Sequence, residues 1–428
     1  MYPNLYYVFK DWFGVDWKFL HFVNSFGFFV AVSFIICSIV LTYELKRKGK
    51  EGLFQPTEEK ITVGKPASPV ELITNFILGF LLGYKVLGLL IVKNSLTVNP
   101  QEYIFSSRGN FWAGIVLGLI FTGLKWREKN KQKLANPETR TIRVWPHDRV
   151  GEITMIALIF GLVGAKIFDT FENWDSFIKD PSSIFSASGL TFYGGLICAG
   201  VALWWYTKKH KIHFVHFLDV MGPVMMLAYA LGRIGCQVSG DGDWGIYNAA
   251  FKTTPGGGIF PAKPEDFPAA LKANAHFFSV HEMHHTFFSK PGFLNFLPNW
   301  FFAYDFPHNV NETGVPLVNC TDTQFCNHLP IPVFPTSLYE IITCLILFGI
   351  LWMMRKRIKI PGLLFGIYLI FNGIERFLIE RIRVNVKMHF LGIEMTQAQL
   401  ISFGLILAGI GMIIYAKTNY KRMQPDTV

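Results

Sequence analysis

The sequence predicts an all-α, polytopic membrane helical bundle of about nine transmembrane helices with an extracytoplasmic arm. Of the 428 residues, 51% are hydrophobic and only 16% are charged, whereas soluble domains carry about 25% charged residues. A helix needs about 20 apolar residues to cross a bilayer. Nine segments meet or approach this length, and they are 20–43, 70–92, 111–126, 150–172, 189–206, 215–235, 336–354, 362–383 and 398–416.

The basic residues predict the orientation of these helices, because Lys and Arg concentrate in cytoplasmic loops. When nine helices are threaded through a membrane, the basic runs all fall on one side, and they lie at 46–48, 125–149, 208–211, 355–359 and 421–422. We therefore expect the N-terminus outside and the C-terminus in the cytoplasm. The same distribution accounts for the net charge of +10 without a nucleic-acid partner.

The chain divides into parts by composition. We expect residues 1–43 to form an outer segment with the first transmembrane helix, and 44–149 to form cytoplasmic connectors with an added transmembrane hairpin. Residues 150–235 form membrane helices, and 236–335 form an arm rich in Pro, Gly, Asn and aromatic residues. Residues 336–428 form further membrane helices and a tail.

Two local patterns add detail. The small-residue spacings Gly79/Gly83 and Gly114/Gly118 let two helices approach closely, which predicts that the added helices pack as a hairpin. Cys320 and Cys326 both lie in the arm, and an oxidising exterior favours a disulfide between them.

The eighth predicted helix carries four unusual polar residues. Asn372, Arg376, Glu380 and Arg383 are spaced by four, four and three, so they share one face. An ionisable side chain at the centre of a membrane helix costs about 2.5 to 3.5 kcal/mol on insertion scales, and such residues usually have a function. The alternative is a helix end that reaches the interface, with an internal Arg376/Glu380 pair.

Other polar groups gather at the same outer end of the predicted bundle. Arg233 ends the sixth helix and opens a loop that contains Asp241, while Tyr193 and Tyr339 lie at the outer starts of two further helices. A guanidinium matches two phosphate oxygens at once. We therefore predict one shared site for an anionic lipid headgroup.

At these residues the chain resembles the prolipoprotein diacylglyceryl transferase family. The resemblance covers the first helix and then about residue 146 to the C-terminus, with the second and third helices as an insertion into a seven-helix plan. Four motifs carry it, namely 189–195 (GLTFYGG), 232–245 (GRIGCQVSGDGDWG), 335–340 (PTSLYE) and 372–383 (NGIERFLIERIR).

The chain departs from the family in two places. The family signature usually reads G-R-x-G-N-F-x-N-x-E-x-x-G, but here Cys236, Gln237 and Ser239 stand at the Asn, Phe and Asn positions, and one extra residue precedes Gly245. Tyr193 stands where many members have a histidine. The general base for the reaction is therefore left open.

The resemblance implies transfer of the sn-1,2-diacylglyceryl group from phosphatidylglycerol to the lipobox cysteine thiol of a prolipoprotein, with release of glycerol 1-phosphate. It implies a bacterial inner-membrane enzyme with no cofactor and no metal, whose partners are phosphatidylglycerol and prolipoprotein signal peptides.

The resemblance also implies roles for individual residues. Arg233 would hold the lipid phosphate and Arg376 would stabilise the leaving group. Glu380 and Asp241 would orient these cations. We assign headgroup contacts to Tyr339, Asn372 and Arg383, and a proton-donating or positioning role to Tyr193.

The sequence is also compatible with two other functions. The 281–285 segment (HEMHH) contains an H-E-x-x-H pattern, in which His281 and His285 could bind zinc with Glu282 as a base. An anion or lipid transporter would also need intramembrane arginines. It would, however, need polar groups along a whole path and internal repeats, and neither is apparent.

Overall fold

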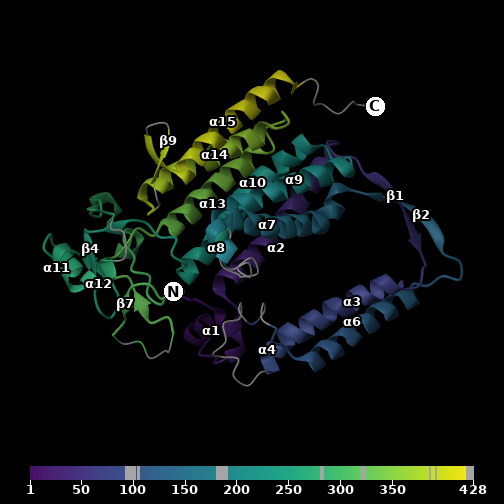
Figure 1. Cartoon of the computed structure of the whole chain (residues 1–428). Helices are drawn as coiled ribbons and strands as arrows, with labels where there is room; N and C mark the ends of the chain where they lie inside the picture. Colours follow the sequence, from purple (N-terminus) through teal and green to yellow (C-terminus); the bar gives the residue numbers. More distant parts are fainter. Residues whose placement is uncertain are drawn as a thin grey trace. The chain divides into compact units, whose positions relative to one another are not determined.

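The computed structural model (Figure 1) describes residues 1–91, 103, 107–179, 191–279, 284–318, 320, 324–384, 387–390 and 393–420. Each of the nine predicted segments overlaps a helix in its described part. The corresponding helices are α2 (Ser25–Lys50), α3 with α4 (Pro69–Leu82 and Gly88–Ile91, joined by a π-helical turn), α6 (Phe111–Lys131), α7 (Val150–Glu172), α9 (Phe192–Lys209), α10 (Phe214–Ser239), α13 (Thr336–Met354), α14 (Leu363–Ile379) and α15 (Gln397–Thr418).

Six of these are long and apolar enough to cross a membrane, judged by length and composition among the described residues: α2, α3–α4, α7, α10, α13 and α15. The other three are α6, α9 and α14. Helix α14 is short, at 17 residues, and α6 and α9 end in basic turns that lower their hydropathy. The prediction of an all-α polytopic membrane protein is confirmed.

The chain forms two compact units. Unit 1 contains Met1–Leu41 and Val215–Val428, and unit 2 contains Thr42–Phe214. Helix α2 runs from one unit into the other.

Unit 1 is built on α10, α13, α14 and α15. Asp219 of α10 is buried, and its carboxylate accepts hydrogen bonds from the backbone N–H groups of Gly362 (2.9 Å) and Phe365 (3.0 Å). It thereby satisfies donors at the start of α14 that the helix itself leaves unpaired. Helices α14 and α15 approach closely, since a Cβ at Gly373 would lie 2.7 Å from the Ser402 carbonyl oxygen.

The arm belongs to unit 1 and consists of short elements between α10 and α13. They are α11 (Asp266–Ala273), α12 (Ala275–Phe278), β3 (Tyr247–Asn248), β4 (Phe251–Thr253), β5 (Ile259–Pro261), β6 (His285–Thr286), β7 (Val315–Pro316) and β8 (Asn327–His328). Strands β4–β5 and β7–β8 pair antiparallel and β3–β6 pair parallel. A disulfide joins Cys320 to Cys326, as the sequence predicts.

Unit 1 also contains α1 (Leu5–Phe13) and the antiparallel pair β9 (Lys387–Phe390) and β10 (Ile393–Thr396). Thr396 caps α15, with its hydroxyl accepting from Gln399 N at 3.2 Å. The predicted tail residues 421 and 422 lie outside the described residues.

Unit 2 contains the predicted hairpin of α3 and α6. A Cβ at Gly79 would lie 2.7 Å from the Leu117 carbonyl oxygen, and one at Gly118 would lie 2.9 Å from the ring of Phe76. The close approach of the two backbones therefore requires glycine, and the predicted packing is confirmed. The unit also holds α7, α8 (Trp174–Lys179), α9 and the antiparallel strands β1 (Thr57–Val63) and β2 (Glu138–Val144).

We predict that Gly79→Leu destabilises the α3–α6 hairpin, because the added side chain must push the α6 backbone away. Overpacking of this kind costs about 1 to 3 kcal/mol. Gly123→Leu is the matched control, since a Cβ at Gly123 meets nothing within 4 Å. Thermal unfolding of the full chain in lipid nanodiscs should show a lower midpoint for Gly79→Leu alone. Equal midpoints would contradict the packing argument.

Candidate active site

The candidate site lies where α10 ends, α13 begins and α14 ends. The loop after α10 is held between the other two elements: Gly245 N donates to the Phe334 carbonyl (2.8 Å), and Ile246 N donates to the Ile382 carbonyl (2.8 Å). A Cβ at Gly245 would lie 2.6 Å from the Ile382 oxygen, so this close approach requires glycine. The loop and the two helix ends therefore form one structure.

Glu340 stands at the centre of the site. Its side chain is fully buried on the first turns of α13, and its carboxylate contacts three arginines: Arg233 (Nε to Oε2, 3.0 Å), Arg376 (Nη1 to Oε1, 3.2 Å) and Arg383 (Nη1 to Oε1, 3.6 Å). The hydroxyl of Tyr229 donates to the same Oε1 at 2.7 Å. One carboxylate thus gathers cations from α10, from α14 and from the segment after it.

Asp243 forms the outer part of the cluster. One of its carboxylate oxygens pairs with Arg233 and the other with Arg383, while its backbone carbonyl accepts from the hydroxyls of Thr336 (2.7 Å) and Ser337 (3.0 Å). Burial raises the pKa of Asp243, but the two guanidiniums outweigh this effect and hold it below its usual range. About 32% of this side chain is exposed, whereas that of Glu340 is fully buried.

Glu380 is a second carboxylate partner of Arg376. It follows α14 by one residue, is fully buried, and pairs with Arg376 (Oε2 to Nη2, 3.2 Å). Arg376 therefore lies between two carboxylates, Glu340 and Glu380, which fix the plane of its guanidinium.

The other predicted site residues have different surroundings. Asn372 lies one turn before Arg376 on α14 and is half-buried. The hydroxyl of Tyr339 donates to the Phe301 carbonyl in the arm (2.6 Å). Tyr193 lies in the first turn of α9 and belongs to unit 2.

Among the described residues, no arginine forms an ion pair with Asp241, whose carboxylate accepts a hydrogen bond from the backbone N–H of Asp243 (3.3 Å). Burial, followed by repulsion from Asp243, raises the pKa of Asp241. The carboxylate that contacts Arg233 from this loop is Asp243, two residues farther along. Sequence reasoning gave no role to Asp243 or Glu340, although both lie within the quoted motifs, because spacing along one chain does not show contacts between helices.

Cys236 lies beside the cluster, with its sulfur 3.6 Å from Arg233 Nη1. Side-chain atoms of Cys236, Asp241 and Asp243 lie within 4.8 Å of one another. A metal ion held by these three groups would lie beside Arg233 and Arg383, whose charges oppose a cation. In the H-E-x-x-H segment, which the sequence offers as an alternative zinc site, His281 and Glu282 lie outside the described residues, and His285 is exposed in β6.

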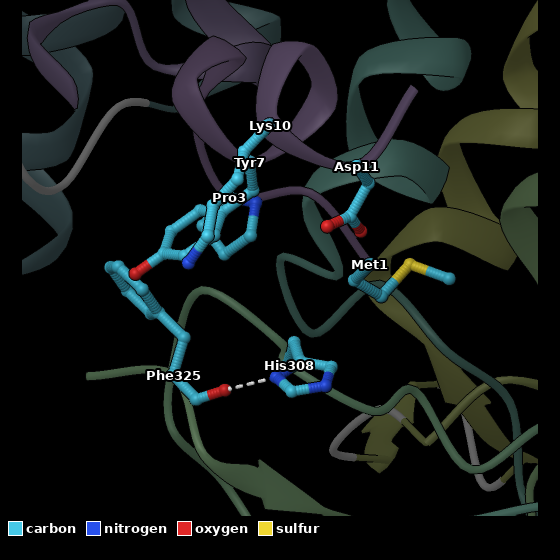
Figure 2. Close-up of a pocket in the computed structure, with 7 residues that line it drawn as sticks. All are labelled: Met1, Pro3, Tyr7, Lys10, Asp11, His308 and Phe325. Carbon is cyan, nitrogen blue, oxygen red and sulfur yellow. Dashed lines mark hydrogen bonds between the residues drawn. The ribbon is translucent and has the colours of Figure 1, made fainter. Parts of the chain in front are cut away.

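A small pocket of about 110 Å³ lies near the loop after α10 but outside the charged cluster (Figure 2). Figure 2 shows side chains of α1 on one side and His308 and Phe325 of the arm on the other. His308 Nδ1 lies 2.9 Å from the Phe325 carbonyl oxygen. A Cβ at Gly240 would lie 3.1 Å from Met1, which also lines the pocket.

The fold and the site together define a polytopic membrane protein with a buried arginine cluster at the ends of its membrane helices. Three guanidiniums aligned in this way can hold a phosphate and stabilise charge that develops on it.

The sequence comparisons identify the family. Residues 110–415 match the family model described as prolipoprotein diacylglyceryl transferase. The chain is similar to the phosphatidylglycerol–prolipoprotein diacylglyceryl transferase of Chlorobaculum tepidum, with 26% identity over 303 residues, 67% of this chain and 80% of that protein. It is similar to the enzyme of the same name from Dehalococcoides mccartyi, with 24% identity over 338 residues, 78% of this chain and 99% of that protein.

The chain therefore belongs to the prolipoprotein diacylglyceryl transferase family, and it is a transferase of the lipoprotein biosynthesis pathway. The matched residues include every member of the arginine cluster. This membership favours the transferase over the zinc peptidase and the transporter.

We predict that Glu340→Gln strongly destabilises unit 1, because the substitution keeps the shape and the hydrogen bond to Tyr229 but leaves buried arginines without their shared counter-charge. Removing one partner of a buried ion pair costs about 3 to 5 kcal/mol. Glu394→Gln, at an exposed position in β10, is the control. Thermal unfolding in nanodiscs measures the difference, and a Glu340→Gln midpoint equal to that of the control would show that the cluster does not depend on this carboxylate.

Proposed function

We propose that the arginine cluster is the catalytic site at which the diacylglyceryl group of phosphatidylglycerol is transferred to the lipobox cysteine of a prolipoprotein. The single observation that carries this proposal is the convergence of Arg233, Arg376 and Arg383 on Glu340 at the ends of membrane helices. Lipid headgroups lie at that depth, so the phosphate of a bilayer lipid can reach the guanidiniums without leaving its leaflet.

The reaction needs positive charge at two points. The cysteine sulfur attacks the glyceryl carbon, a carbon–sulfur bond forms, and the carbon–oxygen bond to phosphate breaks, which releases glycerol 1-phosphate. A free thiol has a pKa of about 8.5, and neighbouring cations increase its thiolate fraction. The departing phosphate gains negative charge, which preorganised guanidinium hydrogens stabilise.

The contacts support a division of roles. Arg233 and Arg383 share Asp243, the most exposed carboxylate of the cluster, so the lipid phosphate competes with Asp243 for these two cations. Arg376 is held between Glu340 and Glu380, which suits a cation that must keep its orientation while charge develops on the leaving oxygen. Glu340 and Glu380 are positioning residues in this proposal.

The remaining sequence-predicted residues keep more limited roles. Asn372 is on the face of α14 that carries Arg376 and could contact the glycerol headgroup. Asp241 and Tyr339 support the loop and the arm next to the headgroup. Tyr193 serves as a proton donor or a positioning group for the acceptor thiol.

We further propose that the site faces outward in the bacterial inner membrane, with the N-terminus in the periplasm and the C-terminus in the cytoplasm. The basic loop 355–359 lies at the opposite ends of α13 and α14 from the cluster. Because basic loops are cytoplasmic, the cluster then faces the side on which exported precursors present their lipobox cysteine.

Incubation of the purified protein with phosphatidylglycerol and a lipobox peptide tests the function directly. Mass spectrometry should detect the thioether product together with glycerol 1-phosphate. A peptide with serine in place of the lipobox cysteine is the control and should remain unmodified. Absence of both products with the cysteine peptide would refute the proposed reaction.

We predict that Arg233→Lys does not support normal transfer. Lysine keeps the positive charge but lacks the planar guanidinium, which can hydrogen-bond Glu340 and the phosphate at the same time. Loss of one preorganised donor lowers turnover by about 10² to 10³. Arg381→Lys is the matched control, since Arg381 is exposed and lies outside the cluster. At equal protein levels, near-normal turnover of Arg233→Lys would show that Arg233 does not grip the phosphate through its fork.

We predict a moderate loss for Tyr193→Phe. A donor or positioning phenol contributes one neutral hydrogen bond, worth about 0.5 to 1.5 kcal/mol, whereas an obligatory base contributes about 10² to 10⁴ in rate. Tyr415→Phe, an exposed position on α15, is the control. A thousandfold collapse of turnover in Tyr193→Phe, with lipid binding unchanged, would instead identify Tyr193 as the base.

A further inference from the structure

The arm exposes an unusual group of aromatic side chains on residues 287–301, which we call the aromatic loop. The exposed fractions are 81% for Phe293, 78% for Phe296, 60% for Phe287, 47% for Trp300 and 43% for Phe288. Single exposed apolar residues are common, but five exposed aromatic side chains within one short segment indicate an interaction surface. The loop is therefore a surface that needs a partner.

The exposed rings belong to a folded segment. Two 3₁₀ turns, Gly292–Leu294 and Asn299–Phe301, shape the loop, and residues three apart lie on the same side of such a turn. Leu294 and Leu297 face inward onto the core formed by Ala250, Phe251, Phe302 and Ala303. Phe293 and Phe296, each one residue earlier, are exposed.

Lys290 closes the loop from within. Its ammonium donates to the carbonyl of Asn295 (3.0 Å) and to that of Leu297. Backbone carbonyls that would otherwise require water are thus satisfied inside the protein, which is a requirement for any segment placed in a poorly hydrated environment.

Both ends of the aromatic loop attach to the start of the membrane helix α13. The ring of Phe288 lies 6.1 Å from that of Phe334, two residues before α13, and the ring of Phe301 lies 5.5 Å from that of Tyr339 in the first turn of α13. The Tyr339 hydroxyl also donates to the Phe301 carbonyl (2.6 Å). The loop is therefore fixed at the depth at which α13 enters the bilayer.

The charge pattern matches a lipid interface. Between Glu282 and Asp305 the sequence has no acidic residue, and Lys290 is the single charged residue of the aromatic loop. Aromatic side chains combined with lysine are typical of segments that lie at the boundary of headgroups and acyl chains. An acidic residue at this depth would be repelled by anionic lipids such as phosphatidylglycerol.

We propose that the aromatic loop binds the lipid surface, with Phe293, Phe296 and Trp300 inserted among the headgroups of the leaflet that contains the arginine cluster. The arm is then held against the membrane beside the site at two points, through α13 and through this loop. The proposal concerns lipid contact alone and does not depend on the chemistry assigned to the cluster.

A fluorescence experiment on the full chain tests the proposal. Phe296→Cys is labelled with an environment-sensitive thiol fluorophore and reconstituted in vesicles of phosphatidylcholine and phosphatidylglycerol, and Phe293→Cys provides an independent second position. Lys263→Cys, an exposed position in the same arm, is the matched control. The unsubstituted chain, labelled in parallel, gives the background from the native cysteines.

We expect the Phe296→Cys and Phe293→Cys labels to be quenched by phospholipids with a shallow nitroxide and protected from aqueous iodide, whereas the Lys263→Cys label shows the reverse. Quenching by iodide alone at both loop positions would overturn the proposal. A lipid signal that appears only after a lipobox peptide is added would make the loop a precursor-binding surface. Self-quenching that rises with protein density would make it a contact between copies of this chain. Either of these outcomes also overturns the proposal, and none of them depends on measured transfer activity.

Discussion

The structure of unit 1 depends on the ion pairs that Glu340 forms with Arg233, Arg376 and Arg383. A buried guanidinium is strongly unfavourable without a counter-charge, and each partner in this group comes from a different element: α10, α13, α14 and the segment after α14. The helices must therefore meet at their ends for the charges to be balanced. The arginines are consequently neutralised only when the helices pack against one another.

In the proposed function, the same arrangement prepares the site for a reaction on a phosphate ester. The guanidiniums are oriented before the substrate arrives, so little reorganisation is required when charge develops on the leaving oxygen. Asp243 pairs with Arg233 and Arg383, and in the proposed reaction the lipid phosphate replaces it at these two cations. The carboxylates thus hold the arginines in place in the resting enzyme and leave Arg376 rigid between Glu340 and Glu380.

The arm is joined to the elements that carry the arginine cluster at several points. It follows directly from the signature loop after α10, returns through Phe334 to α13, and contacts Tyr339 in the first turn of that helix. The aromatic loop lies at this junction. Lipid contact there would restrain the arm and, through Tyr339 and the loop around Gly245, the ends of the helices that carry the arginines.

The sequence by itself determined the fold class, the positions of the nine helices, the α3–α6 glycine packing, the Cys320–Cys326 disulfide, the family and the positions of the arginines. These features follow from hydropathy, from small-residue spacing and from motifs, which are all local along the chain. Helical spacing offered the Arg376/Glu380 pair only as part of the alternative interpretation, a helix end at the interface, and the structure contains this pair. Only the tertiary structure decided that Glu340 joins all three arginines, that Asp243 rather than Asp241 contacts Arg233, and that Tyr339 bonds to the arm. Contacts between different helices, and the direction of a glycine-rich loop whose Gly240 and Gly242 adopt positive φ, depend on how elements pack in space, and sequence spacing carries no information about them.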